Sequence, residues 1–138
     1  MNHAEAYTSL LEHFADYCDA VDRAELDAVM RILDGATLSV AGNELSDPAA
    51  IRRAYQARQQ APGPDGRLRT KHHVTNLRVT GPGADGTLEA AVSYFRLEPG
   101  ADGPVVTTSG RLRQVVLRDG EVWRVRRHEI VADFSSES

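Results

Sequence analysis

The 138-residue sequence predicts one α+β domain, residues 1–138, in which three helices come first and a highly curved, mostly antiparallel sheet follows. Three observations support this fold class. Apolar residues recur at helical spacing up to about residue 60, they alternate beyond residue 66, and turns rich in Gly, Pro and Asp divide the second part into long strands. Because the helices must bury their apolar faces, we expect the sheet to wrap around them and to leave a cavity at its open end.

Residues 4–21 have the spacing of apolar side chains that is typical of a helix with one buried face. Asp22 comes four residues after Cys18, at the edge of that face. Two interpretations of Asp22 stay open. The run Asp22-Arg-Ala-Glu25 has the form of a capping box for a second helix, and the carboxylate is also placed where it can face a cavity.

The second helix is predicted to end at about Leu33, and residues 36–42 are predicted to form a short strand. Asp47 and Pro48 then have the pattern of an N-cap and a first helical residue. A third helix is therefore predicted from this point to about Gln60.

The remaining chain predicts an antiparallel meander. Its strands are expected at residues 68–80, 87–97, 105–118 and 121–134, and residues 135–138 are expected to fray. The turn Asp119-Gly120 predicts a two-residue hairpin loop that pairs Arg118 with Glu121 and Arg111 with His128. One face of this hairpin is apolar, and the other carries Arg111, Arg113, Arg124, Arg126 and His128. A basic face fits a solvated surface, and it also fits a source of cations for an enolate oxygen.

Residues 69–79 contain two adjacent histidines and an asparagine within a strand-like run. Alternation along a strand puts His72 and Asn76 on one face and His73 on the other. Only His72 is therefore expected to share a pocket with Asn76. A histidine in a water-poor cavity can carry protons near neutral pH, although His72 also fits an ordinary strand position.

Composition excludes several classes of function. The net charge of −4 lacks the basic surface that nucleic acids need, and no apolar run approaches the ~20 residues of a membrane span. The N-terminus has no signal-peptide pattern, so a cytoplasmic protein is expected. Cys18, the single cysteine, is predicted to be a small core residue. The histidine and acid spacings match no metal motif, and His72 and His73 point to opposite faces and cannot chelate together. The sequence also has no phosphate-binding loop, so neither a metal nor another cofactor is expected.

Four short motifs carry a resemblance to a known family: Tyr17-x4-Asp22, Lys71-His-His-Val-Thr-Asn76, Ser109-Gly-Arg111 and Asp119-Gly-Glu-Val-Trp123. With the order of elements, they resemble the SnoaL-like, scytalone dehydratase-like branch of the nuclear transport factor 2 superfamily. The resemblance implies a conical barrel of the cystatin-like type.

Within that branch, the catalytic acid and strand histidine fall on Asp22 and His72, and pocket positions fall on Val40, Ser109 and Arg111. The resemblance departs at Val21 and Val40, where that branch has two tyrosines, and near Ser93, where it has a second histidine.

The resemblance implies a hydrogen-bonded Asp22–His72 pair in a hydrophobic cavity, with Arg111 and His128 beside it to stabilise an enolate. Tyr17, Tyr55 and Tyr94 are expected either to line the pocket or to belong to the core. The expected function is that of an isomerase, dehydratase or cyclase in secondary metabolism, acting on a polyketide-like or other polycyclic carbonyl compound. The alternative is a non-catalytic ligand-binding or structural subunit, like the small subunit of ring-hydroxylating dioxygenases. A small-molecule partner is expected in the first case, and an oligomer contact of the apolar face around Trp123 in the second. The fold implies a homodimer, because wide curved sheets of this kind usually bury their convex apolar face against a copy.

Overall fold

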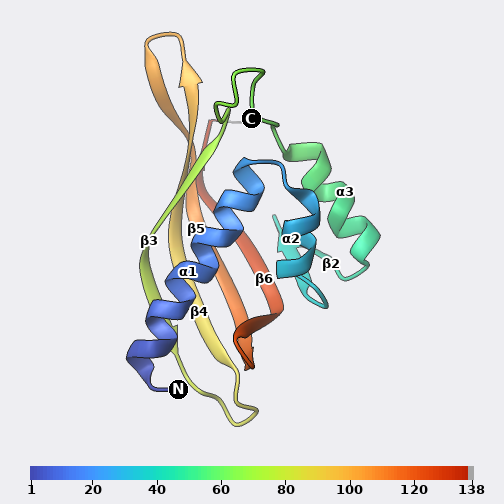
Figure 1. The fold of residues 1–138 in the computed structure, drawn as a ribbon, viewed down its shortest axis with the longest axis vertical. Helices are drawn as coiled ribbons and strands as arrows, with labels where there is room; N and C mark the ends of the chain where they lie inside the picture. Colours follow the sequence, from blue (N-terminus) through green and yellow to red (C-terminus); the bar gives the residue numbers. More distant parts are fainter. Residues whose placement is uncertain (137–138) are drawn as a thin grey trace.

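The computed structural model describes residues 1–136, and three helices and six strands lie within them (Figure 1). The helices are α1 (His3–Asp22), α2 (Leu26–Ile32) and α3 (Pro48–Arg58). The strands are β1 (Thr37–Val40), β2 (Asn43–Leu45), β3 (Lys71–Thr80), β4 (Leu88–Gly100), β5 (Gly103–Asp119) and β6 (Val122–Ser135).

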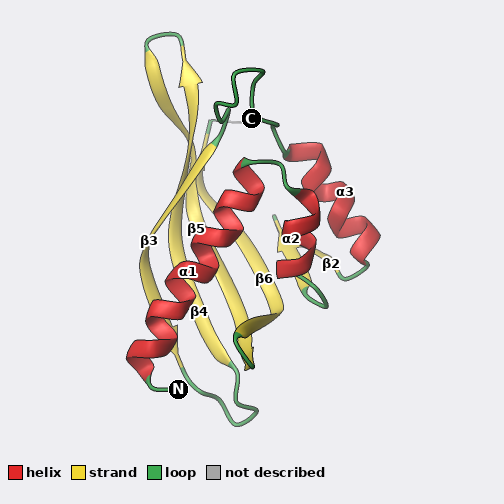
Figure 2. Ribbon diagram, in the orientation of Figure 1, coloured by secondary structure: helices red, strands yellow, loops and turns green. Residues whose placement is uncertain are grey.

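All six strands in the described residues belong to one sheet, in the order β2-β1-β6-β5-β4-β3. Every neighbouring pair is antiparallel except β1 and β6. The sheet curls around the helices but stays open, with β2 and β3 as its edges (Figure 2). The predicted fold class is confirmed. The sequence analysis missed β2, which is too short for its alternation to be visible.

The helices pack on the concave side of the sheet (Figure 2). Leu10 and Phe14 of α1 are fully buried, as is Val116 on the facing side of β5. Trp123 is also inside, where its indole N–H donates to Ser9 Oγ at 2.9 Å. Trp123 is therefore a core residue, and the oligomer contact expected around it is wrong.

Helix ends follow local chemistry at α1 and α3 but not at α2. Asn2 and Glu5 form a capping box at the start of α1, and Asp47 caps α3 through the Ala49 N–H as predicted. Glu25 is the N-cap residue of α2 and makes no side-chain capping bond. The capping interpretation of Asp22 is wrong, because its carboxylate is used elsewhere.

The β5–β6 hairpin differs from the predicted register. Asp119 pairs with Val122, so the loop is Gly120-Glu121, one residue later than expected. A bulge then leaves Arg126 unopposed, because Val116 pairs with Val125 and Val115 with Arg127. The extra residue shifts His128 from the predicted outer face to the inner face, where it pairs with Gln114 and is fully buried.

Four arginines of this hairpin lie on the outer face and bind acidic side chains. Arg111, Arg113, Arg124 and Arg126 are paired with Asp133, Glu129, Asp119 and Asp85, respectively. The solvated-surface interpretation is correct for these four residues.

A second bulge changes the face of Asn76. It lies between Thr75 and Arg78 of β3, and Asn76 there adopts a φ of 57°, which asparagine tolerates better than most residues. The bulge turns Leu77 into the core and leaves Asn76 exposed.

The last two residues that the structure describes, Ser135 and Ser136, are paired with or hydrogen-bonded to β5. Ser135 is the last residue of β6, and both the N–H and the hydroxyl of Ser136 donate to the Thr107 carbonyl. Fraying was expected at these two positions, and residues 137–138 lie outside the described residues. Within the described part, no helix combines the length and apolar character needed to span a bilayer.

Candidate functional site

A cavity of about 410 Å³ opens on the concave side of the sheet. This size is in the range of small-molecule sites. Five of the predicted site residues line it: Tyr17, Val40, Tyr55, His72 and Tyr94. Val21, Leu112 and Ile130 add apolar surface. The cavity therefore combines a mostly apolar wall with a histidine and three phenols.

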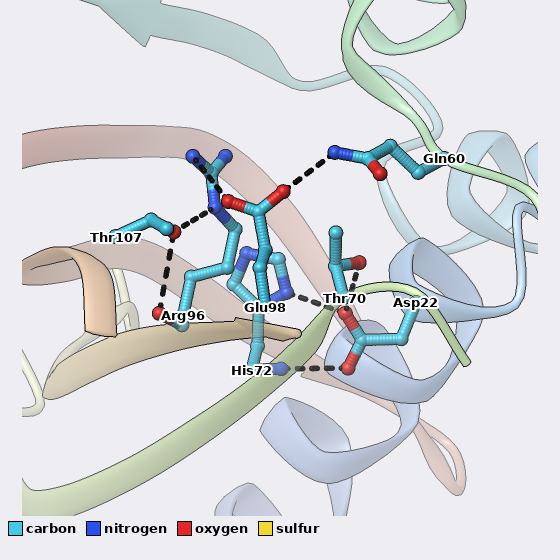
Figure 3. A network of polar contacts seen from close by, with 7 residues as sticks. All are labelled: Asp22, Gln60, Thr70, His72, Arg96, Glu98 and Thr107. Atoms are coloured by element: carbon cyan, nitrogen blue, oxygen red, sulfur yellow. Dashed lines mark hydrogen bonds and ion pairs between the residues drawn. The ribbon is translucent and has the colours of Figure 1, made fainter. Parts of the chain in front are cut away.

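Asp22 and His72 are in direct contact beside this cavity (Figure 3). Asp22 Oδ1 lies 2.6 Å from His72 Nδ1, and Oδ2 accepts the backbone N–H of His72 at 2.7 Å. The Thr70 hydroxyl also donates to Oδ1, at 3.2 Å. The predicted pair is confirmed as a contact.

The local sequence explains how this contact forms. Asp22 is the last residue of α1 and is 2% exposed, because it continues the helix face that buries Phe14 and Cys18. Thr70 lies just before β3 and His72 is two residues further on, inside the strand, so both side chains face α1. The carboxylate thus joins the end of α1 to the edge strand.

The geometry defines the chemistry of the imidazole. A carboxylate accepts hydrogen bonds, so Nδ1 carries a proton and donates it to Asp22. Nε2 of the neutral ring then has the free lone pair, and His72 lines the cavity. His72 is suited to act as a base toward a ligand, while Asp22 orients the ring and stabilises its cation.

Two charged residues of β4, Arg96 and Glu98, lie next to the Asp22–His72 pair (Figure 3). Gln60 donates to Glu98 at 2.6 Å, and the guanidinium of Arg96 donates to Thr107 Oγ1 at 2.9 Å. Burial opposes the charge of Glu98. Hydrogen bonds from Thr107 and Gln60 and the nearby charge of Arg96 outweigh it and hold the pKa of Glu98 below its ordinary value. The cavity wall at Arg96 therefore keeps a charged acid close to His72.

Five polar side chains form a hydrogen-bonded series that starts at the cavity wall and continues into the core. We call this series the relay. Tyr55 and Tyr17 join through their hydroxyls at 2.6 Å, and Tyr17 Oη lies 3.1 Å from His128 Nε2. His128 Nδ1 is 2.8 Å from Gln114 Nε2, and Gln114 Oε1 is 2.7 Å from His13 Nε2.

Burial sets the protonation of the relay. It raises the pKa of Tyr17 well above its ordinary value and also raises the pKa of Tyr55. Burial, with a smaller effect of nearby His13, lowers the pKa of His128 to about 3. His128 is therefore neutral near pH 7, and both tyrosines keep their protons.

Five predicted site residues do not line the cavity: Asp22, which contacts it through His72, and Asn76, Ser109, Arg111 and His128. Asn76 is turned outward by the β3 bulge, and Arg111 lies on the outer face with its guanidinium bound to Asp133 at 3.0 and 3.2 Å. Ser109 donates to the Tyr94 carbonyl at 3.2 Å. His128 lies behind the lining and reaches the cavity through Tyr17, and its predicted pairing with Arg111 is wrong.

Sequence reasoning missed several polar residues of the site. Arg96 and Glu98 belong to a strand whose alternation was visible but whose bulge was not, and Thr70 lies just before the start of β3. Gln114 is 2% exposed between the buried apolar residues Leu112 and Val116, and this polar interruption was the available signal. Gln59 lines the cavity, and its buried Nε2 has no hydrogen-bond partner among residues 1–136.

Other reactive groups fit structural roles. Burial raises the pKa of Cys18 to about 12, in keeping with a core thiol. Among the described residues, no group of three or more His, Cys, Asp and Glu side chains is placed to hold a metal ion.

These features define a class of protein: a curved α+β fold with a ligand-sized cavity and an acid–histidine pair at its wall. A profile of the SnoaL-like domain matches residues 2–129. The chain belongs to this family.

Solved structures show the same fold. ActVI-ORFA from Streptomyces coelicolor is 14% identical, with a TM-score of 0.79 over 94% of this chain and 98% of that one. Aln2 from a Streptomyces species is 20% identical, with a TM-score of 0.76 over 96% and 94% of the two chains. A protein assigned as the beta subunit of an aromatic-ring-hydroxylating dioxygenase from Novosphingobium aromaticivorans is 14% identical, with a TM-score of 0.74 over 98% and 94%. A search of curated proteins found no match.

Proposed function

We propose that this protein catalyses proton transfer on a small carbonyl compound, with His72 as the base and Asp22 as its orienting partner. The observation that carries this proposal is the 2.6 Å contact between Asp22 Oδ1 and His72 Nδ1 at the wall of the cavity. It leaves Nε2 as the nitrogen with a lone pair for the ligand.

The proposed reaction begins at the carbon next to the carbonyl group. His72 Nε2 takes a proton from this carbon, the C–H bond breaks, and its electron pair moves to the carbonyl oxygen as an enolate. Return of the proton to another carbon is an isomerisation. Loss of a β-hydroxyl, which leaves as water with the proton held by His72, is a dehydration. Attack of the enolate carbon on a second carbonyl is an aldol cyclisation.

The cavity supports a flat, largely apolar substrate. Its wall combines aromatic rings with aliphatic side chains, and the rings of His72 and Tyr94 are 6.1 Å apart. We therefore propose a polyketide-like or other polycyclic carbonyl compound of secondary metabolism as the substrate class.

The test is deuterium exchange at the α-carbon of 2-tetralone in D2O, followed by proton NMR, because exchange reports proton removal whatever the natural product is. His72→Gln should lower the enzyme-catalysed rate by ~100-fold or more. His73→Gln is the matched control, since His73 stacks on Phe95 on the opposite face of β3. Its rate should equal that of the parent protein.

Asp22→Asn tests the orienting role. An asparagine amide that donates to His72 Nδ1 moves the ring proton to Nε2, so we expect a similar loss of exchange. This substitution also weakens the join between α1 and β3, and thermal unfolding should record a lower Tm. Equal exchange in the parent protein and His72→Gln would contradict the proposal.

The alternative is a non-catalytic ligand-binding or structural subunit. The similarity to a dioxygenase beta subunit is a similarity of fold, and the exposed side chains of Val105, Val106 and Phe134 offer apolar contact surface. On this alternative the parent protein catalyses no exchange, and a larger subunit copurifies with it.

A further inference from the structure

The relay has a direction that Gln114 determines. A side-chain amide accepts at its oxygen and donates at its nitrogen. Gln114 Oε1 is 2.7 Å from His13 Nε2, so His13 donates. Gln114 Nε2 is 2.8 Å from His128 Nδ1, so His128 accepts there. A neutral imidazole that accepts at Nδ1 carries its proton at Nε2.

The direction continues to the cavity. His128 Nε2–H donates to the Tyr17 hydroxyl oxygen at 3.1 Å. The Tyr17 proton is then free to go to Tyr55, whose hydroxyl oxygen is 2.6 Å away. Tyr55 accepts this bond, so its own O–H is not used inside the relay. Both tyrosines line the cavity, and the last proton of the relay therefore belongs to its wall.

We propose that Tyr55 donates a hydrogen bond to the carbonyl or enolate oxygen of the substrate, and that Gln114 and His128 are positioning residues that set the direction of the relay. The identity of the ligand as a carbonyl compound rests on the proposed function. The direction of the relay does not.

The arrangement suits an oxygen that gains negative charge. Two phenols in series strengthen each other as donors when the acceptor becomes an anion, and the buried setting reduces competition from water. Each relay member between His13 and the cavity has a partner on both sides. The donor is therefore already oriented before the ligand arrives. The raised pKa of Tyr55 is consistent with a phenol that stays a donor over the neutral range.

The first test is the tautomer of His128 in the parent protein. Long-range ¹H–¹⁵N NMR distinguishes a protonated from an unprotonated ring nitrogen, and His128→Gln assigns the resonances. We expect the proton on Nε2. A proton on Nδ1 would overturn the proposal, because the Gln114 amide would then be turned and every bond reversed, with Tyr55 donating to Tyr17.

The second test is ligand selectivity. Dissociation constants of 2-tetralone and of tetralin, its hydrocarbon analogue, are measured by ligand-observed NMR for the parent protein, Tyr55→Phe and Tyr7→Phe. Tyr55→Phe should weaken 2-tetralone about fivefold to tenfold and leave tetralin unchanged. Tyr7→Phe removes a phenol that does not line the cavity and should change neither constant.

The outcomes separate this inference from the proposed function. Unchanged binding of 2-tetralone to Tyr55→Phe, or equal weakening of both ligands, would overturn the role of Tyr55. Neither test depends on turnover, so failure of the exchange reaction would leave both readouts intact. Conversely, loss of exchange in His72→Gln with no ketone selectivity in the parent protein would support the proposed base and contradict the proposed donor.

Discussion

Asp22 shows how one buried residue can serve both the fold and the site. Its carboxylate accepts from the His72 backbone, the His72 ring and Thr70, so it holds the edge strand against α1 while it orients the imidazole. A buried carboxylate with three donors is well compensated for its loss of water. The capping box in the sequence was misleading, because the same carboxylate had better donors 48 and 50 residues away.

His128 should make stability depend on pH. Its pKa is about 3 in the folded protein and near 6.5 when unfolded, so the unfolded chain takes up a proton that the folded protein refuses. Its contribution is fully present above pH 6.5 and is lost progressively as the pH falls toward 3. Between pH 7 and pH 5 we expect a loss of about 2 kcal/mol in the free energy of unfolding, measured by urea denaturation.

The control for this prediction is His128→Gln, which removes the titrating ring and keeps a polar side chain. Other groups, including His13, titrate in both proteins, so the difference between the two pH dependences isolates His128. The variant should lose about 2 kcal/mol less than the parent protein over the same interval. Identical losses would contradict the assigned burial of a neutral imidazole.

At the scale of elements, bulges decide which side chains reach the site. The extra residue in β3 turns Leu77 inward in place of Asn76, and the extra residue at Arg126 brings His128 into the core. A shift of one residue exchanges the two faces of a strand beyond it. Strict alternation therefore assigned His72 to the correct face, because His72 precedes the bulge in β3. It assigned Asn76 and His128 to the wrong faces, because a bulge in each strand reverses the alternation there.

Gly110 permits close packing of β5 against β6 next to a further bulge. A Cβ atom at this position would lie 2.0 Å from the Val131 carbonyl oxygen, a backbone atom that cannot move without breaking the pairing. Gly110→Ala should lower the free energy of unfolding by ~3 kcal/mol, measured by urea denaturation.

Gly83→Ala is the matched comparison, since its nearest neighbour would be 3.4 Å away, at the Asp85 side chain. Its cost should be below ~1 kcal/mol. Similar stabilities for the two variants would show that β6 can shift to accept a side chain at position 110.

At the scale of the whole molecule, the open sheet offers two different surfaces. Its concave side carries the helices, the core and the cavity, and much of its outer side carries paired charges. The β4–β5 hairpin extends beyond the rest of the sheet (Figure 1). Near that end, Val105, Val106 and Phe134 are 46%, 56% and 75% exposed. We therefore expect an apolar contact there rather than across the outer face.

We propose that two copies associate through this end of the sheet. Light scattering after size-exclusion chromatography should give twice the 15.1 kDa chain mass. Phe134→Asp should give the mass of one chain, because it places a charge in the contact. Val122→Asp, at the other end of β6 and 52% exposed in the parent protein, should leave the dimer intact. A monomeric parent protein would contradict the proposal.

The helices, the four long strands and the order of the elements could be predicted from the sequence, because they depend on local periodicity and on turn chemistry. Periodicity also placed His72 on the correct face, since His72 precedes the first bulge of its strand. Its pairing with Asp22 was implied only by the family resemblance. The parallel pairing of β1 with β6, the exclusion of Asn76 and Arg111 from the cavity lining, and the burial of His128 became visible only in the folded molecule. One extra residue in a strand reverses its faces, and the energy that selects such a bulge comes from packing between segments far apart in the chain.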